Sequence, residues 1–506
     1  MLDVIVIGAG FSGVCAAIKL REQGITNFQV FDKAPKVGGT WYHNTYPGVA
    51  CDVASHLYCY SFEPNPNWSR VFAPGAEIRD YIEHCTKKYG VDTHINHGMA
   101  CTGARFNDQN QLWEVSFADG SVYTAHHVIV GNGGLHVPSF PNIQGRDEFA
   151  GVAMHSAEWN HEVDLTGKRV AMVGTAASAV QILPEIAKIA AHVDVYQRTP
   201  NYIMPRNDRD YTEKEKQRFA RFPLLAKLLR TKLFYKGELT SYPLVKTKED
   251  TKYSLKARDL INLFMRKSVQ DESAHPHLTP DYGPGCKRIL LSDSFFATLN
   301  KDNVSLVTDG VQRIQADGIV TGADELRKAD VIIFATGYDI EKHMLSLPIT
   351  GPKGINLMDT WTQLPEAYEG AMVAGYPNIF FTTGPNTGVG TTSVVYMIEK
   401  QVGFILQCIK KAGHTGLVAP TQRAQREFND EIQEKLQGTV WAGNCKSYYK
   451  REDGKIATLY PYNARTFTKR HKKVDWTHVA MQPRTVAATL TPATQESPAG
   501  ELEMSS

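Results

Sequence analysis

The apolar residues of this chain gather in short, uninterrupted runs that end at glycine. Val4–Ile7 is the first, and similar runs lie within Arg169–Val173 and Asp330–Phe334. Such runs predict strands that are buried on both faces, as in a parallel sheet. After the first two, apolar residues recur at helical spacing in Val14–Leu20 and Val180–Ala190. Repeated strand–helix units predict an α/β fold with two doubly wound, Rossmann-like domains.

The turn after the first strand has the spacing G-x-G-x-x-G. Gly8 would form the tight turn, Gly10 would let the backbone approach a pyrophosphate, and Gly13 would let helix and strand pack closely. Ser12 lies inside the motif, at the helix N-terminus that would face the phosphates. The next strand ends at Asp32, where an acidic side chain can accept a ribose hydroxyl. The pattern predicts a dinucleotide site; the alternative is a glycine-rich turn without a ligand.

A second strand–turn–helix unit follows, with alanine at the second and third glycine positions. Its turn comprises Gly174, Thr175, Ala176, Ala177, Ser178 and Ala179. The small side chains of Ala176 and Ala179 still permit close approach. The following strand ends in Gln197-Arg198-Thr199 instead of an acidic residue. An arginine here accommodates a 2′-phosphate, which favours NADP over NAD; the alternative is a surface arginine.

Composition excludes several classes of protein. The 506 residues have a formal net charge of +2, so no nucleic-acid partner is indicated. Eight cysteines without C-x-x-C pairs indicate neither a disulfide framework nor a metal site. There is no apolar run long enough for a transmembrane helix, and the first strand begins too near Met1 for a signal peptide. We therefore expect a soluble, cytoplasmic protein.

Two segments differ in character from the rest. Residues 206–284 are basic and rich in leucine and phenylalanine, and they predict a helical insertion. Within it, Glu213–Lys236 predicts one helix with Phe219, Phe222, Leu225 and Leu229 on one side. A basic amphipathic helix can lie on a membrane surface, but we expect this one to pack against its own protein. Residues 477–506 have little apolar content and predict a disordered tail.

The linker between the two nucleotide units reads Phe149-x-Gly151-x-x-x-His155-x-x-x-Trp159. This pattern is far more specific than a glycine motif, and it resembles the fingerprint of the flavin-containing and Baeyer–Villiger monooxygenases. Three other stretches resemble the same family: Gly38-Gly39-Thr40-Trp41, Ala335-Thr336-Gly337-Tyr338, and the tract from Gly375-Tyr376-Pro377-Asn378 through Gly384-Pro385-Asn386-Thr387-Gly388. The resemblance extends from Met1 to about Trp476 and implies FAD and NADPH as cofactors.

We expect a discontinuous FAD-binding domain from residues 1–145 and 365–476. The NADP-binding domain would comprise 146–205 and 285–364, with 206–284 as the helical insertion. The segment Gly443–Tyr449 resembles the family's C-terminal loop, which folds over NADP and the substrate.

The resemblance also assigns roles to individual residues. Asp52 resembles the family's active-site aspartate, and Lys287-Arg288 resembles its basic pair, in which the lysine reaches the 2′-phosphate and the arginine lies beside the flavin. The catalytic candidates are therefore Arg288 and Asp52. The expected cofactor-binding residues are Gly8, Gly10, Ser12, Gly13, Asp32, Thr40, Trp41, Asp52, Tyr58, Cys101, Gly174, Thr175, Ala176, Ser178, Ala179, Arg198, Thr199, Lys287 and Arg288.

The expected reaction converts a ketone to an ester or lactone with O2, through a C4a-peroxyflavin. A peroxide anion needs a fixed cation, and arginine stays protonated. Asp52 would hold Arg288 in place. Asn160 follows the linker motif where the Baeyer–Villiger subgroup typically has Pro or Asp. The alternatives are an N- or S-oxygenating flavin monooxygenase and, more remotely, a non-catalytic redox sensor. The ketone and the oligomeric state are not indicated by the sequence.

Overall fold

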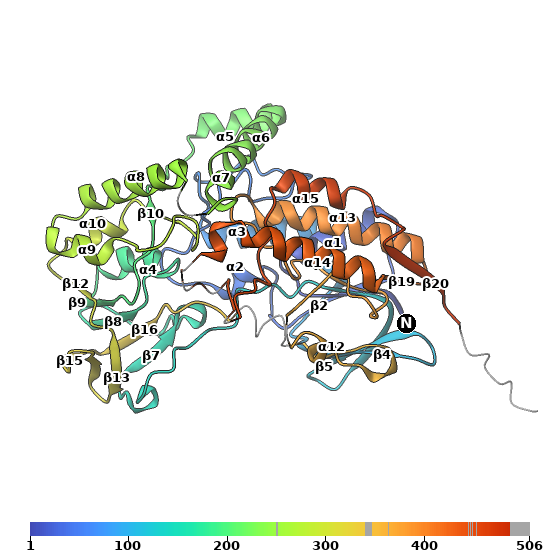
Figure 1. The fold of residues 1–506 in the computed structure, drawn as a ribbon, viewed down its shortest axis with the longest axis horizontal. Helices are drawn as coiled ribbons and strands as arrows, with labels where there is room; N and C mark the ends of the chain where they lie inside the picture. Colours follow the sequence, from blue (N-terminus) through green and yellow to red (C-terminus); the bar gives the residue numbers. More distant parts are fainter. Residues whose placement is uncertain are drawn as a thin grey trace, which may run out of the picture.

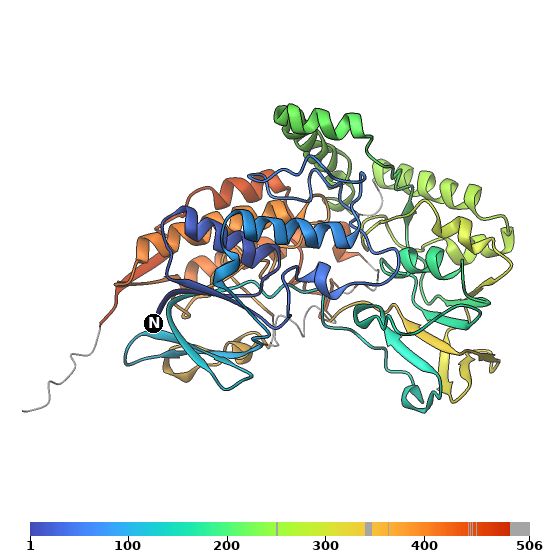
Figure 2. The same cartoon turned by 180° about the vertical axis from the view of Figure 1, so that it is seen from behind.

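The structure is a computed structural model that describes residues 1–248, 251–339, 347–362, 364–443, 445, 447, 449–451 and 453–485. It has two lobes, each built on a largely parallel sheet with helices packed against it, and a group of helices that projects beyond them (Figures 1 and 2). The predicted α/β class with two Rossmann-like sheets and a helical insertion is confirmed.

The first sheet lies at the right of Figure 1 and has the strand order β17-β4-β5-β6-β1-β2-β3, with β18 also pairing with β6. Its strands are β1 (Leu2–Ile7), β2 (Phe28–Asp32), β3 (Ile95–His97), β4 (Cys101–Asn107), β5 (Leu112–Phe117), β6 (Val122–Val130), β17 (Ile349–Thr350) and β18 (Ile379–Phe381). Strand β1 lies between β2 and β6 and is parallel to both. The predicted buried strand Val4–Ile7 and the predicted strand that ends at Asp32 are confirmed.

Strand β6 changes its pairing partners along its length. The N-terminal half of β6 pairs antiparallel with β5, and its C-terminal half pairs in parallel with β1 and β18. One uninterrupted strand therefore serves both the hairpin and the parallel core. The change of partners leaves no signal in the chain, because it depends on which strands lie alongside.

The second sheet, at the left of Figure 1, is entirely parallel, with the order β12-β9-β8-β16-β7. Its strands are β7 (Val152–His155), β8 (Arg169–Val173), β9 (His192–Tyr196), β12 (Val304–Val307) and β16 (Val331–Phe334). Three short antiparallel strands form a separate sheet: β13 (Val311–Gln315), β14 (Gly318–Thr321) and β15 (Leu326–Lys328). Strands β10 (Ile203–Met204) and β11 (Leu290–Leu291) join the chain on either side of the insertion.

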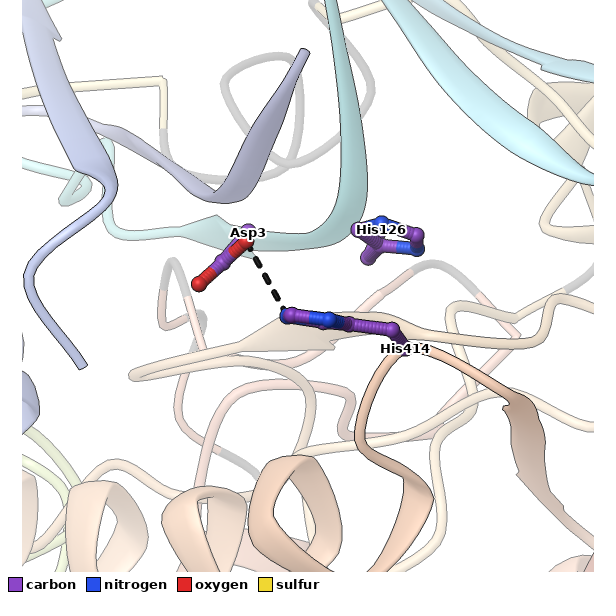
Figure 3. Close-up of side chains that lie close together, drawn as sticks. All are labelled: Asp3, His126 and His414. Carbon is purple, nitrogen blue, oxygen red and sulfur yellow. Dashed lines mark ion pairs between the residues drawn. The ribbon is translucent and has the colours of Figure 1, made fainter.

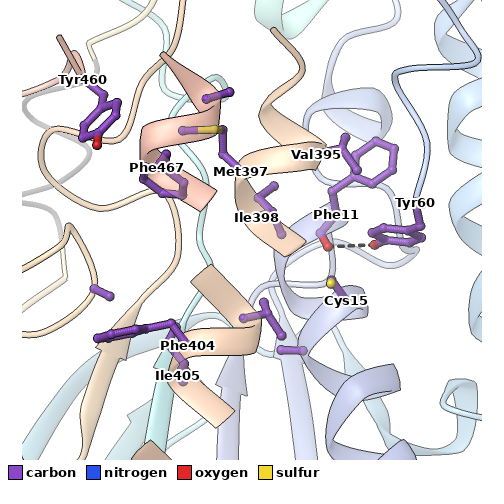
Figure 4. Close-up of a cluster of buried hydrophobic side chains, with 14 of the residues drawn as sticks. Phe11, Cys15, Tyr60, Val395, Met397, Ile398, Phe404, Ile405, Tyr460 and Phe467 are labelled. Atoms are coloured by element: carbon purple, nitrogen blue, oxygen red, sulfur yellow. Dashed lines mark hydrogen bonds between the residues drawn. The ribbon is translucent and has the colours of Figure 1, made fainter. Parts of the chain in front are cut away.

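The largest core cluster of the first lobe lies between helices that are far apart in sequence. Helix α1 (Phe11–Glu22) packs against α13 (Val394–Ala412). Figure 4 shows Phe11 and Cys15 of α1 facing Val395 and Ile398 of α13, and the Tyr60 hydroxyl donating a hydrogen bond of 2.7 Å to the Phe11 carbonyl. The other helices of this lobe are α2 (Thr40–His43), α3 (Gly75–Lys88), α12 (Leu357–Thr360), α14 (Gln422–Gln437) and α15 (Ala464–His471). The second lobe contains α4 (Ala179–Ile186) and α10 (Phe295–Leu299).

The insertion is helical, as predicted, but its first helix is broken. Pro223 begins a new helix, because proline lacks the N–H that a helix interior requires. The helices are α5 (Glu213–Arg221), α6 (Pro223–Thr240), α7 (Tyr242–Val245), α8 (Lys252–Ser268) and α9 (His275–Leu278). Phe219 packs against His56, with ring centroids 4.5 Å apart. Phe222 and Leu225 are exposed, so the expected packing of that whole apolar side is wrong.

Two expected boundaries also change. Strand β20 (Val479–Pro483) pairs antiparallel with β19 (Gly416–Pro420), so the predicted disordered tail begins with an ordered strand. Strand β17 pairs with β4 of the first sheet, so the expected NADP-binding segment 285–364 extends too far. None of the helices in the described ranges has the length and apolar content that crossing a bilayer requires.

Candidate active site

One cavity of about 900 Å³ is lined by both predicted nucleotide units. The sequence-predicted residues that line it are Gly8, Gly10, Ser12, Asp32, Thr40, Trp41, Asp52, Tyr58, Cys101, Ala176, Ser178 and Arg288. The other predicted residues do not line it: Gly13, Gly174, Thr175, Ala179, Arg198, Thr199 and Lys287. The structure therefore brings most of the first unit to one space and leaves part of the second outside it.

The first glycine turn admits no side chain. Gly8 has φ +98°, and a Cβ there would lie 2.5 Å from the Gly131 carbonyl oxygen. A Cβ on Gly13 would lie 1.7 Å from the Gly8 carbonyl oxygen. Gly13 therefore acts behind the cavity, by letting α1 approach β1.

The same turn forms a cradle with a second glycine pair. A Cβ on Gly39 would lie 2.9 Å from the Gly10 Cα, so the two backbones meet with no room for a side chain. Gly10 is the N-cap of α1 and has no side chain to bond the first amides of the helix. Backbone amides at a helix N-terminus suit a pyrophosphate. This geometry fits the diphosphate of FAD.

Asp32 stands at the end of β2 and fixes the glycine turn. Its carboxylate accepts hydrogen bonds from the backbone N–H groups of Ala9, at 2.5 Å, and Ala34, at 2.7 Å. The side chain is buried yet borders the cavity. A contact of Asp32 with a ribose hydroxyl stays a prediction.

Arg288 and Asp52 form a two-pronged ion pair on the cavity wall. Arg288 donates from Nε to Asp52 Oδ2 at 2.6 Å and from Nη2 to Oδ1 at 2.7 Å. Burial raises the pKa of Asp52, but the charge and hydrogen bonds of Arg288 outweigh it and hold that pKa below the ordinary value. Arg206, which sequence reasoning missed, donates a 2.8 Å hydrogen bond to the Cys51 carbonyl and so holds the residue before Asp52. The carboxylate is therefore ionised at neutral pH.

Two aromatic side chains line the cavity near this ion pair. Trp41 Nε1 donates a hydrogen bond of 3.3 Å to the Tyr58 hydroxyl. Burial raises the pKa of Tyr58 above its ordinary value, so the phenol stays protonated. Thr40 and Cys101 complete this part of the lining.

The second glycine turn repeats the close approach of the first. Gly174 has φ +109°, and a Cβ there would lie 2.5 Å from the Ala335 carbonyl oxygen. Ala179 is completely buried in the core of its lobe, while Ala176 and Ser178 face the cavity. The carbonyl of Thr175 accepts a hydrogen bond of 3.1 Å from Asn201. The turn thus combines two packing positions with two that can meet a ligand.

Arg198 and Lys287 come near each other outside the cavity. Burial lowers the pKa of the Lys287 ammonium, and the positive charge of Arg198 lowers it further. Arg198 is exposed, and Thr199 next to it is half-buried. Two neighbouring cations with a hydroxyl beside them form a surface that suits a phosphate.

Gln181 of α4 connects the lobes and was not predicted. Its Nε2 donates to the Ala50 carbonyl at 3.0 Å, and its Oε1 accepts from the Tyr46 hydroxyl at 3.1 Å. The backbone of Gly48 packs directly against the backbone of Gln181, because a Cβ on Gly48 would lie 2.5 Å from the Gln181 carbonyl oxygen. A polar residue on a helix gives no sequence signal for such a role.

A disulfide joins Cys286 to Cys445, which corrects the expectation that the cysteines form none. The two residues are 159 positions apart, so no spacing motif could reveal the pair. Cys286 directly precedes Lys287-Arg288, and Cys445 belongs to the predicted C-terminal loop, of which Asn444, Lys446 and Tyr448 lie outside the described residues. The bond ties this loop to the segment that carries Arg288.

We expect thiol titration of the denatured, unreduced protein to count six cysteines, and eight after reduction, because six cysteines are free in the structure. Cys445→Ser should then expose one additional thiol from Cys286 and lower the thermal midpoint by several degrees, since closing so long a loop constrains the unfolded chain. Cys101→Ser is the control and should remove one free thiol only. Eight thiols before reduction would show that the pair is not bonded.

Asp3, His126 and His414 are close enough together to hold a metal ion, although no metal ligands were predicted. Figure 3 shows the ion pair between Asp3 and His414, with an N–O distance of 3.1 Å, and His126 beside them. Arg484 bonds to Nδ1 of His126. A guanidinium at this point repels a cation, and none of these three side chains borders the cavity.

A largely parallel sheet and a wholly parallel one, each with a glycine turn bordering the same cavity, are typical of proteins that bind two dinucleotides. A family model described as pyridine nucleotide-disulphide oxidoreductase matches residues 5–217. A Baeyer–Villiger monooxygenase of Pseudomonas aeruginosa is 41% identical over 464 residues, which cover 90% of this chain and 87% of that protein. Another from Streptomyces coelicolor is 37% identical over 93% of this chain and 91% of its own length.

The solved structures agree. The crystal structure of OTEMO in complex with FAD and NADP has a TM-score of 0.86 and 27% sequence identity, and the match covers 95% of this chain and 99% of that one. The chain belongs to the Baeyer–Villiger monooxygenase family. The family predicted from the linker motif is thereby confirmed.

Proposed function

We propose that this chain oxidises a ketone to an ester or lactone with O2, using Arg288 and Asp52 in the cavity that both nucleotide units share. FAD and NADPH are its cofactors; when bound, they supply oxygen activation and the reducing hydride. The observation that carries the proposal is the two-pronged Arg288–Asp52 ion pair on the wall of that cavity.

Arg288 provides a permanent positive charge where the reacting oxygen carries negative charge. A guanidinium cannot lose its proton at physiological pH, so it acts only as a fixed cation. Its side chain is 35% exposed, toward a cavity from which a bound cofactor would exclude water. In such a place, a charge stabilises a transition state more than it does in bulk water.

Asp52 is a positioning residue in this scheme. Its two oxygens hold both Nε and Nη2 of Arg288, which leaves the guanidinium little freedom to rotate. The lowered pKa of Asp52 keeps it ionised, and the opposing charge holds the arginine in the geometry that the reaction needs. Arg206 supports Asp52 from behind, through the Cys51 carbonyl.

The chain's own groups would hold the two cofactors in distinct ways. Gly10 and Gly39 would admit the FAD diphosphate, with Gly8 and Ser12 beside it, and Asp32 would meet the ribose. Trp41 and Tyr58 would lie against FAD. On the second unit, Ala176 and Ser178 would receive the NADPH diphosphate. Arg198, Thr199 and Lys287 would receive its 2′-phosphate.

We expect Arg198→Ala and Lys287→Ala each to raise the KM for NADPH by about 10- to 100-fold, because each removes a charged hydrogen bond to the 2′-phosphate. The KM for NADH should stay the same, so the preference for NADPH falls. Steady-state oxidation of both nucleotides measures this. Lys188→Ala, an exposed lysine of the same lobe paired with Glu185, is the control and should change neither value. Equal losses with both nucleotides would contradict the 2′-phosphate role.

The reaction itself is tested by a product screen. The protein is supplied with FAD, NADPH and O2, together with a panel of cyclic, linear and aryl ketones, a thioether and an amine. An ester or lactone containing one atom from labelled O2 supports the proposal. Sulfoxide or N-oxide alone would favour heteroatom oxygenation, and bound FAD with no NADPH oxidation would favour a non-catalytic protein.

We place the enzyme in the cytoplasm, because the reaction consumes NADPH that metabolism regenerates there. A disulfide is rare in that reducing compartment. We therefore block the free thiols at the moment of lysis and count them. Eight free cysteines would mean that the Cys286–Cys445 bond is open in the cell, as a reducing cytoplasm predicts. Six would mean that the bond is closed, which would argue against the cytoplasm.

A further inference from the structure

Helix α6 presents apolar side chains to solvent. Leu224, Leu228, Tyr235 and Leu239 are 66%, 56%, 43% and 72% exposed. At 100° per residue, these positions fall on one stripe along the helix. Large apolar side chains rarely line up on the outside of a helix unless something covers them.

The opposite face of α6 is already packed. Ala226 and Phe234 are buried, and Arg230 donates hydrogen bonds to the carbonyls of His56, Leu57 and Cys59. The inner face of α6 therefore makes the contacts that hold the helix to the protein, and the outer apolar stripe takes no part in them.

The exposed apolar surface continues beyond α6. Phe222 and Leu225 lie at the start of the helix, and Tyr253, Leu260 and Leu263 lie on α8. The Tyr253 hydroxyl donates a 2.9 Å hydrogen bond to the Thr240 carbonyl, which joins the two helices. In the described residues, nine of the 21 large exposed apolar side chains lie between positions 222 and 263, so the surface is concentrated here. Figures 1 and 2 show α5 and α6 projecting away from both sheets.

The same segment concentrates positive charge. Residues 213–268 contain 15 Lys or Arg against six Asp or Glu, an excess of nine positive charges, whereas the whole chain has a net charge of +2. The remainder of the protein is therefore negative by seven. Lys227, Lys232 and Lys236 flank the apolar stripe on α6 and are exposed.

We propose that the outer face of α6, together with α5 and α8, docks on the surface of an anionic lipid bilayer. Apolar side chains flanked by lysines match a layer in which acyl chains lie beneath negative headgroups. A second copy of this chain is a poor occupant, because two such faces would bring like charges together. The rest of the protein has a net negative charge, so the negative headgroups would repel it and orient the basic helices toward the membrane.

The inner face of α6 connects this surface to the active site. A Cβ on Gly237 would lie 2.3 Å from the Thr391 carbonyl oxygen, and Glu238 accepts a hydrogen bond of 3.4 Å from the Thr391 hydroxyl. Thr392, the next residue, lines the cavity. Docking therefore places one wall of the cavity beside the lipid, in which apolar ketones dissolve. This link to the substrate is the only step that rests on the proposed function.

The test is co-sedimentation of the full-length, FAD-loaded protein with phosphatidylcholine vesicles, with and without phosphatidylserine. We expect binding to the phosphatidylserine vesicles only, and its loss when the salt concentration is raised. The triple variant Leu224→Ser/Leu228→Ser/Leu239→Ser should bind at least about 100-fold more weakly. Lys227→Glu/Lys232→Glu/Lys236→Glu should lose roughly a factor of 100 as well.

The matched control is Ile189→Ser/Leu326→Ser/Ile355→Ser, three exposed apolar residues outside this surface, which should bind as the parent does. Bound FAD and the unfolding midpoint report that each variant is folded. Absence of binding by the parent protein, or equal binding by the stripe and control variants, overturns the proposal. So does a stripe variant that changes the oligomeric state instead, since the stripe would then join two copies. Vesicle binding does not depend on turnover, so it stands or falls separately from ketone oxidation.

Discussion

Arg288→Ala is expected to lower the rate of ester formation by about 100- to 1,000-fold, the usual cost of removing one preorganised electrostatic contact in an active site. The reason is that the guanidinium is the positive charge that Asp52 fixes on the cavity wall. FAD content should remain stoichiometric, because the glycine cradle that fits the diphosphate is formed elsewhere, by Gly10 and Gly39. Ester formation measured by gas chromatography, with FAD content from absorbance, checks the prediction.

Two matched variants separate charge from geometry. Arg288→Lys keeps the positive charge but not the two-pronged contact, so it should retain more activity than Arg288→Ala. Asp52→Asn keeps the shape but removes the negative charge, so its loss should be intermediate. Full ester formation by Arg288→Ala would remove the role that we assign to the arginine.

Gly13→Ala is expected to destabilise the first lobe by about 3 kcal/mol or more and to abolish FAD binding. The added Cβ would lie 1.7 Å from the Gly8 carbonyl oxygen, so α1 would have to move away from β1. That movement displaces Gly10 and the helix N-terminus, which together form the cradle. Denaturant unfolding and the ratio of FAD to protein after gel filtration measure the two effects.

Gly403→Ala is the control for this substitution. Gly403 lies inside α13, and a Cβ there meets no atom within 4 Å. Alanine favours a helix interior over glycine by about 1 kcal/mol, so this variant should be as stable as the parent or more so, with FAD retained. A Gly13→Ala protein that keeps stoichiometric FAD and its unfolding midpoint would contradict the packing role of this glycine.

Local pattern was sufficient for the strands and turns of both nucleotide units. Val4–Ile7 and Arg169–Val173 form parallel strands, and Gly8 and Gly174, which follow them directly, have positive φ angles and close backbone contacts. The pairing of Asp52 with Arg288, residues 236 positions apart, came from the resemblance to a family and is confirmed as an ion pair. Their roles in the reaction stay predictions.

The insertion shows where such reasoning fails. Its helical character follows from the periodicity, but periodicity does not say which apolar side meets the protein. Phe219 is packed, whereas Phe222 lies at the Pro223 break and is 51% exposed. The surface that we assign to lipid therefore became visible only once the neighbours of α6 were in place.

The sequence by itself determined the parallel strands that carry the glycine turns, the turns themselves and the family of this protein, because each depends on residues that are close in the chain or on motifs of fixed spacing. Only the tertiary structure decided the Cys286–Cys445 bond, the contacts of Gln181 between the lobes and the ordered start of the predicted tail. These depend on which distant segments meet, and that is settled by the packing of whole lobes rather than by any local pattern.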